Sequence, residues 1–246
     1  MKLTNNPLAL VTGASAGIGA ASARALCAAG ARVLLAARRV DRLQALAHEL
    51  PGSEVLQLDV RDADAVRSAL QDQPIDIAVL NAGLARGTGP LQEGDPADWD
   101  EMLDTNVKGV LYCARAVLPG MLERGRGDLV LMGSVAGRQV YPDGNVYNAS
   151  KFAVHAIYQA LRLDAGGRGV RFTTLDPGMV KTEFARVRFR GDEARASAVY
   201  EGMQALTPED VADALVYAVT RPAHVNVGEI VLWPTCQSST RDVART

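Results

Sequence analysis

Short apolar runs alternate with longer amphipathic stretches along all 246 residues, and this alternation narrows the possible folds more than any other feature. The first run spans residues 8–12, and the Ala-rich stretch behind it, 18–29, ends at Gly30. The runs are apolar throughout, which is typical of parallel strands covered on both faces. Strands joined by helices of this length predict βαβ units, and hence an α/β fold built on a doubly wound parallel sheet.

The same pattern continues to the end of the chain. Further strands are expected at 32–37, 55–59, 75–81, 129–134, 170–176 and 230–232, and further helices at 41–50, 63–70, 96–124, 147–165 and 208–220. No linker rich in Pro, Gly or Ser divides the sequence, so we expect one domain over residues 1–246. The long irregular stretch 181–206 is expected to be a lid over the substrate, because such loops in compact domains are usually lids or binding loops.

Composition excludes several classes of partner. The formal net charge of −2 provides no basic field for nucleic acid. No apolar stretch approaches the roughly 20 residues that cross a bilayer, and the first apolar run is too short for a secretion signal. Cys27, Cys113 and Cys236 are an odd number and form no C-x-x-C pair. Reduced thiols in a cytoplasmic protein without a metal site are therefore expected.

The first predicted strand runs into the sequence TGASAGIG, residues 12–19. Glycines between a strand and a helix let the backbone approach a pyrophosphate, toward which the helix amides point. A tight turn with close helix–sheet packing would need the same residue type, but the position directly after the first strand favours phosphate binding. The predicted phosphate-binding residues are Gly13, Ser15, Gly17, Ile18 and Gly19.

The end of the second predicted strand indicates which dinucleotide binds. An NAD-binding chain needs a carboxylate there for the ribose 2′-hydroxyl, but this strand runs into Arg38 and Arg39, with no acid before Asp41. Two cations at a helix start oppose its dipole, and a 2′-phosphate between them would remove that conflict. A solvated arginine pair is the alternative. We predict that the cofactor is NADP.

Tyr147 and Lys151 are four residues apart in a predicted helix and therefore share one face. A neighbouring ammonium favours the phenolate and would lower the tyrosine pKa from its usual value of about 10, so that the hydroxyl can exchange protons with a substrate. An exposed pair without function is the alternative. Ser134 ends the fifth predicted strand, where it can bind a carbonyl oxygen. Asn106 and Gly109 are poor mid-helix residues and predict a local distortion.

These features occur in a fixed order together with Asn-Ala-Gly at 81–83 and Pro-Gly at 177–178. The set closely resembles the short-chain dehydrogenase/reductase family over essentially the whole chain. The resemblance implies a Rossmann sheet of seven parallel strands and a homotetramer packed through helices and the C-terminal segment. It also implies a catalytic tetrad, which here would consist of Asn106, Ser134, Tyr147 and Lys151.

The resemblance implies a role for each tetrad member. Tyr147 would be the general acid/base, Ser134 would orient the substrate oxygen, and Lys151 would lower the tyrosine pKa and hold the nicotinamide ribose. Asn106 would position a water in the proton relay. Further coenzyme contacts implied by the resemblance are Asp59, Val60, Asn81, Ala82, Gly83, Pro177, Gly178, Val180 and Thr182. Ala16 stands where many NADP-dependent members carry a basic residue, so the choice of NADP rests on Arg38 and Arg39.

Four further stretches narrow the substrate. Within the family, residues 115–121, 187–192, 206–211 and 221–226 look like those of the NADP-dependent 3-hydroxy acid dehydrogenases, including serine 3-dehydrogenase. This resemblance implies a substrate such as serine, allo-threonine or 3-hydroxyisobutyrate, interconverted with its 3-oxo acid or semialdehyde.

Arginines in the predicted lid agree with an acid substrate. If that segment is extended, Arg186, Arg188 and Arg190 share one face and can hold a carboxylate. Arg138 is a second candidate, and a solvated arginine face is the alternative. We therefore expect the substrate to contact Arg138, Arg186 and Arg188 besides Ser134 and Tyr147.

Two other functions stay open at this point. A related enzyme could reduce an uncharged aldehyde or ketone with the same tetrad. A catalytically silent NADP-binding regulator is the second alternative, and the presence of both Tyr147 and Lys151 counts against it.

Overall fold

The computed structural model describes residues 2–246, so Met1 of the predicted domain 1–246 lies outside the described part. Seven parallel strands form one sheet in the order β3-β2-β1-β4-β5-β6-β7, which confirms the predicted doubly wound fold. The strands are β1 (Leu8–Thr12), β2 (Arg32–Ala37), β3 (Glu54–Gln57), β4 (Ile77–Leu80), β5 (Gly127–Met132), β6 (Val170–Pro177) and β7 (Glu229–Leu232).

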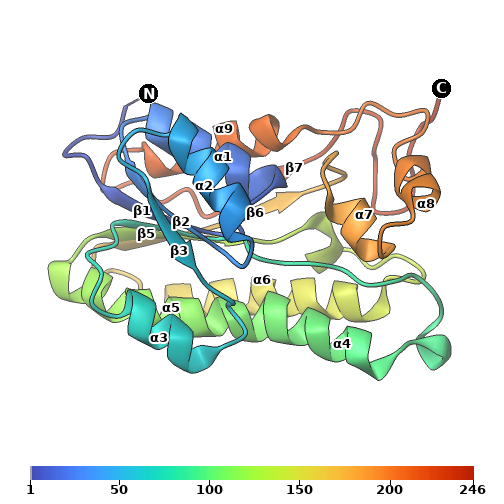
Figure 1. The fold of residues 1–246 in the computed structure, drawn as a ribbon, viewed down its shortest axis with the longest axis horizontal. Helices are drawn as coiled ribbons and strands as arrows, with labels where there is room; N and C mark the ends of the chain where they lie inside the picture. The colour runs from blue at the N-terminus through green and yellow to red at the C-terminus, as the bar shows by residue number, and fades with distance from the viewer. Residues whose placement is uncertain (1) are drawn as a thin grey trace.

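Helices cover both faces of the sheet in two layers (Figure 1). One layer consists of α1 (Gly17–Ala28), α2 (Val40–Glu49) and α9 (Pro208–Val219). The other consists of α3 (Ala63–Leu70), α4 (Pro96–Leu103), α5 (Gly109–Arg124) and α6 (Asn145–Ala165). Two short helices, α7 (Phe184–Arg188) and α8 (Glu193–Ala198), lie together to one side of the layers. Within residues 2–246, no helix is long and apolar enough to cross a membrane.

Side chains of successive strand residues enter opposite hydrophobic clusters. In β1, Leu8 and Leu10 pack into the cluster that contains residues of α3, α5 and α6. Ala9 and Val11 pack into the cluster that contains residues of α1, α2 and α9. Since successive side chains of a strand point to opposite faces, a strand covered on both faces must be apolar at every position. This explains the continuous apolar runs in the sequence.

Apart from shifts of one or two residues at the ends of elements, the structure differs from the predicted elements at two places. The long helix predicted over 96–124 is interrupted by a π-helical turn at Asp104–Lys108, which confirms the distortion expected around Asn106. The prediction that 181–206 is irregular is wrong, because α7 and α8 lie within it. Each helix is too short to show a helical period in the sequence, yet each buries an alanine against the protein: Ala185 and Ala196.

The sheet changes its winding direction between β1 and β4, which are neighbours although β2 and β3 intervene in the chain. Ligands of open α/β sheets bind at the carboxyl ends of strands at such a point. The hydroxyl of Thr12 joins the two strand ends there: it donates to Val79 O (3.3 Å) and accepts from Asn81 N (2.9 Å) and Ala82 N (3.1 Å). This buried residue therefore fixes the chain on both sides of the crevice.

Replacing Thr12 by valine, which has the same shape, removes this junction. The Ala82 amide then loses its hydrogen-bond partner, so we expect Thr12→Val to lower the free energy of unfolding by about 1–3 kcal/mol. Thr12→Ser keeps the hydroxyl and is the matched control. Urea unfolding of both variants measures the difference, and a valine variant more stable than the serine variant would contradict the assignment.

Candidate active site

A cavity of about 540 Å³ opens at the carboxyl ends of the central strands. Its walls come from the glycine turn, from the segments after β4, β5 and β6, from α6 and from α7. Predicted site residues that line it are Gly13, Gly17, Ile18, Asn81, Ala82, Gly83, Ser134, Tyr147, Lys151, Pro177, Gly178, Val180, Thr182 and Arg188. The fold therefore gathers residues spread over some 175 positions of the chain, from Gly13 to Arg188, into one site.

The glycine turn has no room for side chains. A Cβ on Gly19 would lie 2.3 Å from the carbonyl oxygen of Gly13, and Gly13 and Gly17 have φ angles of +68° and +52°. The first turn of α1 contains no acidic residue, and no side chain caps its amides. Free amides at a helix N-terminus beside a closely packed backbone fit the pyrophosphate of a dinucleotide.

Of the two arginines after β2, Arg39 contacts this turn. Arg39 donates from Nε and Nη2 to Ser15 Oγ (3.2 and 3.1 Å). Arg61 hydrogen-bonds to Asp59 and keeps the pKa of that carboxyl below its usual value, and the charge of Arg38 adds a smaller effect in the same direction. The charge of Arg38 thus acts on Asp59, and the guanidinium of Arg39 contacts Ser15. Two guanidiniums in these positions fit a 2′-phosphate.

Lys151 is buried at the base of the cavity, where Nζ donates to Met132 O at 2.9 Å. Nζ lies 6.0 Å from the centre of the Tyr147 ring. Burial lowers the pKa of Lys151 to about 8, and the negative charge of Asp176 opposes this shift. Half of the side chains at this pKa still carry a proton at pH 8, so the ammonium predominates at neutral pH.

Tyr147 lines the cavity deep in the protein and keeps part of its surface open to it. Burial raises its pKa above the ordinary value, although a hydrogen bond with Ser134 and the charge of Arg188 act in the opposite direction. The sequence predicts a lowered pKa instead. The structure differs because removing the phenolate from water outweighs the Ser134 hydrogen bond and the charge of Arg188.

Ser134 and Asn106 are held by the backbone around them. Ser134 begins the 3₁₀ turn at Val135–Gly137, where its Oγ accepts from Ala136 N (3.1 Å). Asn106 lies in the π turn, buried, and makes two 2.8 Å hydrogen bonds with the backbone of Leu84. Its Nδ2 also donates to Ser150 Oγ (3.0 Å) on α6. Asn106 therefore ties the chain after β4 to the helix that carries Tyr147 and Lys151.

Arg188 brings a positive charge to the catalytic end of the cavity. Its Nε donates to Gly87 O (2.8 Å) and its Nη1 to the hydroxyl of Tyr141 (2.9 Å). Its guanidinium carbon lies 5.9 Å from the centre of the Tyr147 ring. None of the carboxylates in residues 2–246 forms an ion pair with it. The site thus contains a cation without an anionic partner in the described chain.

The other candidate arginines point elsewhere. Arg186 forms an ion pair with Glu193 (2.7 Å), Arg190 with Asp98, and Arg138 with Asp176 (2.7 Å) and Glu229. The predicted common face of 186, 188 and 190 is wrong, because α7 is helical and alternate helix residues lie on different sides. Neither Arg138 nor Arg186 lines the cavity.

Several predicted coenzyme residues do not line the cavity: Ser15, Gly19, Arg38, Arg39, Asp59 and Val60. The sequence does not identify other residues that line the cavity, among them Glu183 and Phe184. The ring of Phe184 meets that of Tyr147 edge-on, with 5.5 Å between centroids, and Glu183 precedes it in the wall. Phe184 and Arg188 are four residues apart, so recognising α7 as a helix would have placed both on one face.

Comparison with known proteins agrees with this geometry. The family model for short chain dehydrogenases matches residues 7–193. An NADP-dependent 3-hydroxy acid dehydrogenase from Salmonella typhi is 46% identical over 239 residues, covering 94% of this chain and 96% of that protein. Sulfoacetaldehyde reductase 2 from Chromohalobacter salexigens is 44% identical over 240 residues, covering 94% and 95%. The closed form of a serine dehydrogenase complexed with NADP⁺ has a TM-score of 0.92 and 43% identity, covering 97% of this chain and 100% of that one.

A glycine turn, a buried Tyr–Lys pair and a serine at one sheet edge define an enzyme that oxidises an alcohol or reduces a carbonyl with a dinucleotide. The chain belongs to the short-chain dehydrogenase/reductase family. It is an NADP-dependent oxidoreductase that acts on CH–OH groups, as the sequence predicts.

Proposed function

We propose that this enzyme interconverts a 3-hydroxy acid and the corresponding 3-oxo acid or semialdehyde, with serine, allo-threonine and 3-hydroxyisobutyrate as the first candidates. The observation that carries the proposal is Arg188, a cation without a carboxylate partner beside Tyr147. One carbon separates the reacting carbon of a 3-hydroxy acid from its carboxylate. A molecule of this length can reach both side chains, because the guanidinium carbon of Arg188 lies 5.9 Å from the centre of the Tyr147 ring. A carboxylate would supply the missing counter-charge.

The names of the relatives favour an anionic substrate over an uncharged aldehyde or ketone. One relative is named for 3-hydroxy acids and another for sulfoacetaldehyde, and both kinds of molecule carry an acidic group close to the reacting carbon. An anionic group common to both agrees with a guanidinium in the cavity. The uncharged substrate stays as the second candidate.

The coenzyme supplies the hydride or accepts it. We propose that the glycine turn holds its pyrophosphate and that Arg38, Arg39 and Ser15 hold its 2′-phosphate. The adenosine would lie against Asp59, Val60 and the segment 81–83, and the nicotinamide side against Pro177, Gly178, Val180 and Thr182. Free amides of α1 and the absence of an acid after β2 support this orientation.

Tyr147 would donate the proton to the carbonyl oxygen in reduction and remove it in oxidation. Its raised pKa keeps the hydroxyl protonated at neutral pH, which is the form that reduction needs. Ser134 Oγ would orient the same oxygen, and Lys151 would hold the ribose and stabilise the developing phenolate. Asn106 would position a relay water near α6, where its contacts with Leu84 and Ser150 already fix its amide.

Arg188→Ala removes the proposed partner of the carboxylate. Loss of charge-assisted hydrogen bonds of about 1.5–3 kcal/mol lowers kcat/KM for a 3-hydroxy acid by about 10- to 100-fold. Steady-state assays that follow NADPH absorbance measure this change in kcat/KM. Arg186→Ala is the control from the same helix, whose guanidinium pairs with Glu193 outside the cavity. An equal loss in both variants, or no loss in either, would favour the uncharged substrate.

Tyr147→Phe tests whether the protein is an enzyme that uses Tyr147 or a catalytically silent NADP-binding regulator. General acid–base catalysis contributes about 100- to 10,000-fold, so kcat should fall by this factor. NADPH binding, followed by its fluorescence, should weaken by no more than about tenfold, because at most one hydrogen bond of about 0.5–1.5 kcal/mol is lost. A wild-type protein that binds NADPH but turns over no alcohol or carbonyl would instead support the regulator.

The segment 181–206 is proposed to be the substrate lid. Its helix α7 forms part of the cavity wall through Phe184, Val187 and Arg188. The similarity to a protein described in a closed form with NADP⁺ supports a conformation in which this segment covers the site. Cytoplasmic localisation is proposed from the free thiols, since no disulfide joins the cysteines in residues 2–246.

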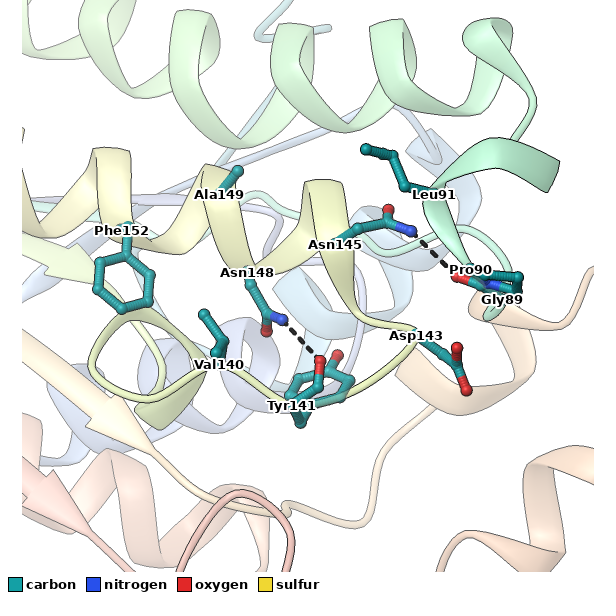
Figure 2. A pocket seen from close by; sticks show the side chains of 10 residues that line it. All are labelled: Gly89, Pro90, Leu91, Val140, Tyr141, Asp143, Asn145, Asn148, Ala149 and Phe152. Carbon is teal, nitrogen blue, oxygen red and sulfur yellow. Dashed lines mark hydrogen bonds between the residues drawn. The ribbon is translucent and has the colours of Figure 1, made fainter.

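A homotetramer is proposed on the exposed apolar side chains of the α5–α6 layer. Leu111 on α5 and Phe152 on α6 are 44% and 42% exposed, and apolar surface of this kind can be covered by another copy of the chain. A groove of about 410 Å³ is lined by Phe152, Leu91 and Val140, and Figure 2 shows these side chains. We expect a molar mass by light scattering near four times that of the 26.1 kDa chain, and a monomer would contradict the proposal.

A further inference from the structure

A chain of ion pairs connects the coenzyme side of the site to α7. Glu183 accepts from Arg39 Nη1 through Oε2 (3.1 Å) and from Arg42 Nη1 through Oε1 (2.5 Å). Both arginines keep the pKa of Glu183 below its usual value, although burial acts against them. Arg39 also binds Ser15 Oγ, so a single guanidinium touches the glycine turn and the residue that begins α7.

Glu183 is directly linked to the catalytic end of the cavity. It lies in the cavity wall immediately before Phe184, whose ring is 5.5 Å from that of Tyr147. The amide of Val187 donates to the carbonyl oxygen of Glu183 (2.9 Å), so the backbone of Glu183 belongs to the hydrogen-bonded frame of α7. A shift of Glu183 therefore shifts the helix that carries Phe184 and Arg188.

The far end of α7 is anchored on the opposite side of the cavity. Arg86 Nη1 donates to Val187 O (2.7 Å), and Gly87 N donates to Arg188 O (3.0 Å). Arg188 Nε returns a hydrogen bond to Gly87 O (2.8 Å). The helix is thus fixed to the segment after β4 at one end and to the two arginines near the coenzyme side at the other.

Arg39 can bind a phosphate without releasing Glu183. A guanidinium has five N–H groups, of which three are engaged by Ser15 and Glu183, so two remain for a further acceptor. Phosphate, Arg39, Glu183 and Arg42 would then form a row of alternating charges. A phosphate that holds Arg39 also removes conformational freedom from its side chain, and the pair with Glu183 forms at a smaller entropic cost.

We propose that Glu183 is a positioning residue that couples occupation of the 2′-phosphate site to the placement of α7 over Tyr147. NADP then favours the arrangement in which Phe184 and Arg188 face the substrate, and NAD, which lacks the phosphate, does not. Coenzyme choice thus acts on the substrate side of the site as well as on coenzyme affinity. This inference rests on the proposed assignment of Arg39 to the 2′-phosphate.

Hydrogen–deuterium exchange of α7 tests the coupling without turnover. The probes are adenosine 2′,5′-bisphosphate and adenosine 5′-monophosphate, each at saturation. An ion pair exposed to this extent contributes about 0.5–1 kcal/mol, so the bisphosphate should slow exchange of the Val187 and Phe189 amides about two- to fivefold more than the monophosphate. In Glu183→Gln this difference should disappear while the bisphosphate still binds.

Glu193→Gln is the matched control, because it removes a carboxylate from the same segment that pairs with Arg186 instead. It should retain the difference between the two nucleotides. The coupling is overturned if Glu183→Gln also retains it, or if the wild type shows none although the bisphosphate binds more tightly. Equal affinity of the wild type for both nucleotides would instead overturn the 2′-phosphate assignment itself, and this inference with it.

Discussion

Parallel strand pairing is the constraint on which the rest of this structure depends. Parallel strands must be connected by crossovers, so the carboxyl ends of β1, β4, β5 and β6 all lie at the same edge of the sheet. That edge receives the glycine turn, Asn81, Ser134 and Pro177 in sequence order. The hydroxyl of Thr12 then joins the central pair of strand ends through three hydrogen bonds. The active site is therefore a consequence of topology before any catalytic residue is considered.

Arginine pairing determines how the remaining wall of the site is built. Lysine is rare in this chain, and most cations along the 181–206 segment are arginines that bind a carboxylate or a backbone carbonyl. Planar guanidiniums with several donors can join two elements at once, as Arg39 joins Ser15 to Glu183. Arg188 lines the cavity, and its two hydrogen bonds go to the uncharged oxygens of Gly87 and Tyr141. Its charge is consequently available to a substrate.

Local patterns in the sequence account for most of the fold. The strand bounds of β1 and β2 agree with the apolar runs, and the poor helix formers around Asn106 locate the π turn. The proposed tetrad rests on the resemblance of residues along the chain to the short-chain dehydrogenase/reductase pattern. Contacts between distant segments could not be predicted in this way. Arg138 pairs with Asp176, which lies 38 residues further along the chain. Arg39 pairs with Glu183, which lies 144 residues further along. The helicity of α7 depends on such contacts, and the predicted extended arginine face was wrong for that reason.

We propose that Arg188 selects a substrate whose carboxylate lies close to the reacting carbon, and that Tyr147 exchanges a proton with the oxygen on that carbon. The most direct measurement compares 3-hydroxypropionate with its methyl ester, which has the same reacting carbon and no charge, using NADP⁺ and following NADPH absorbance. The account predicts a kcat/KM for the acid at least about tenfold above that for the ester, as expected for a charged hydrogen bond. An ester oxidised as well as the acid, or better, would contradict it.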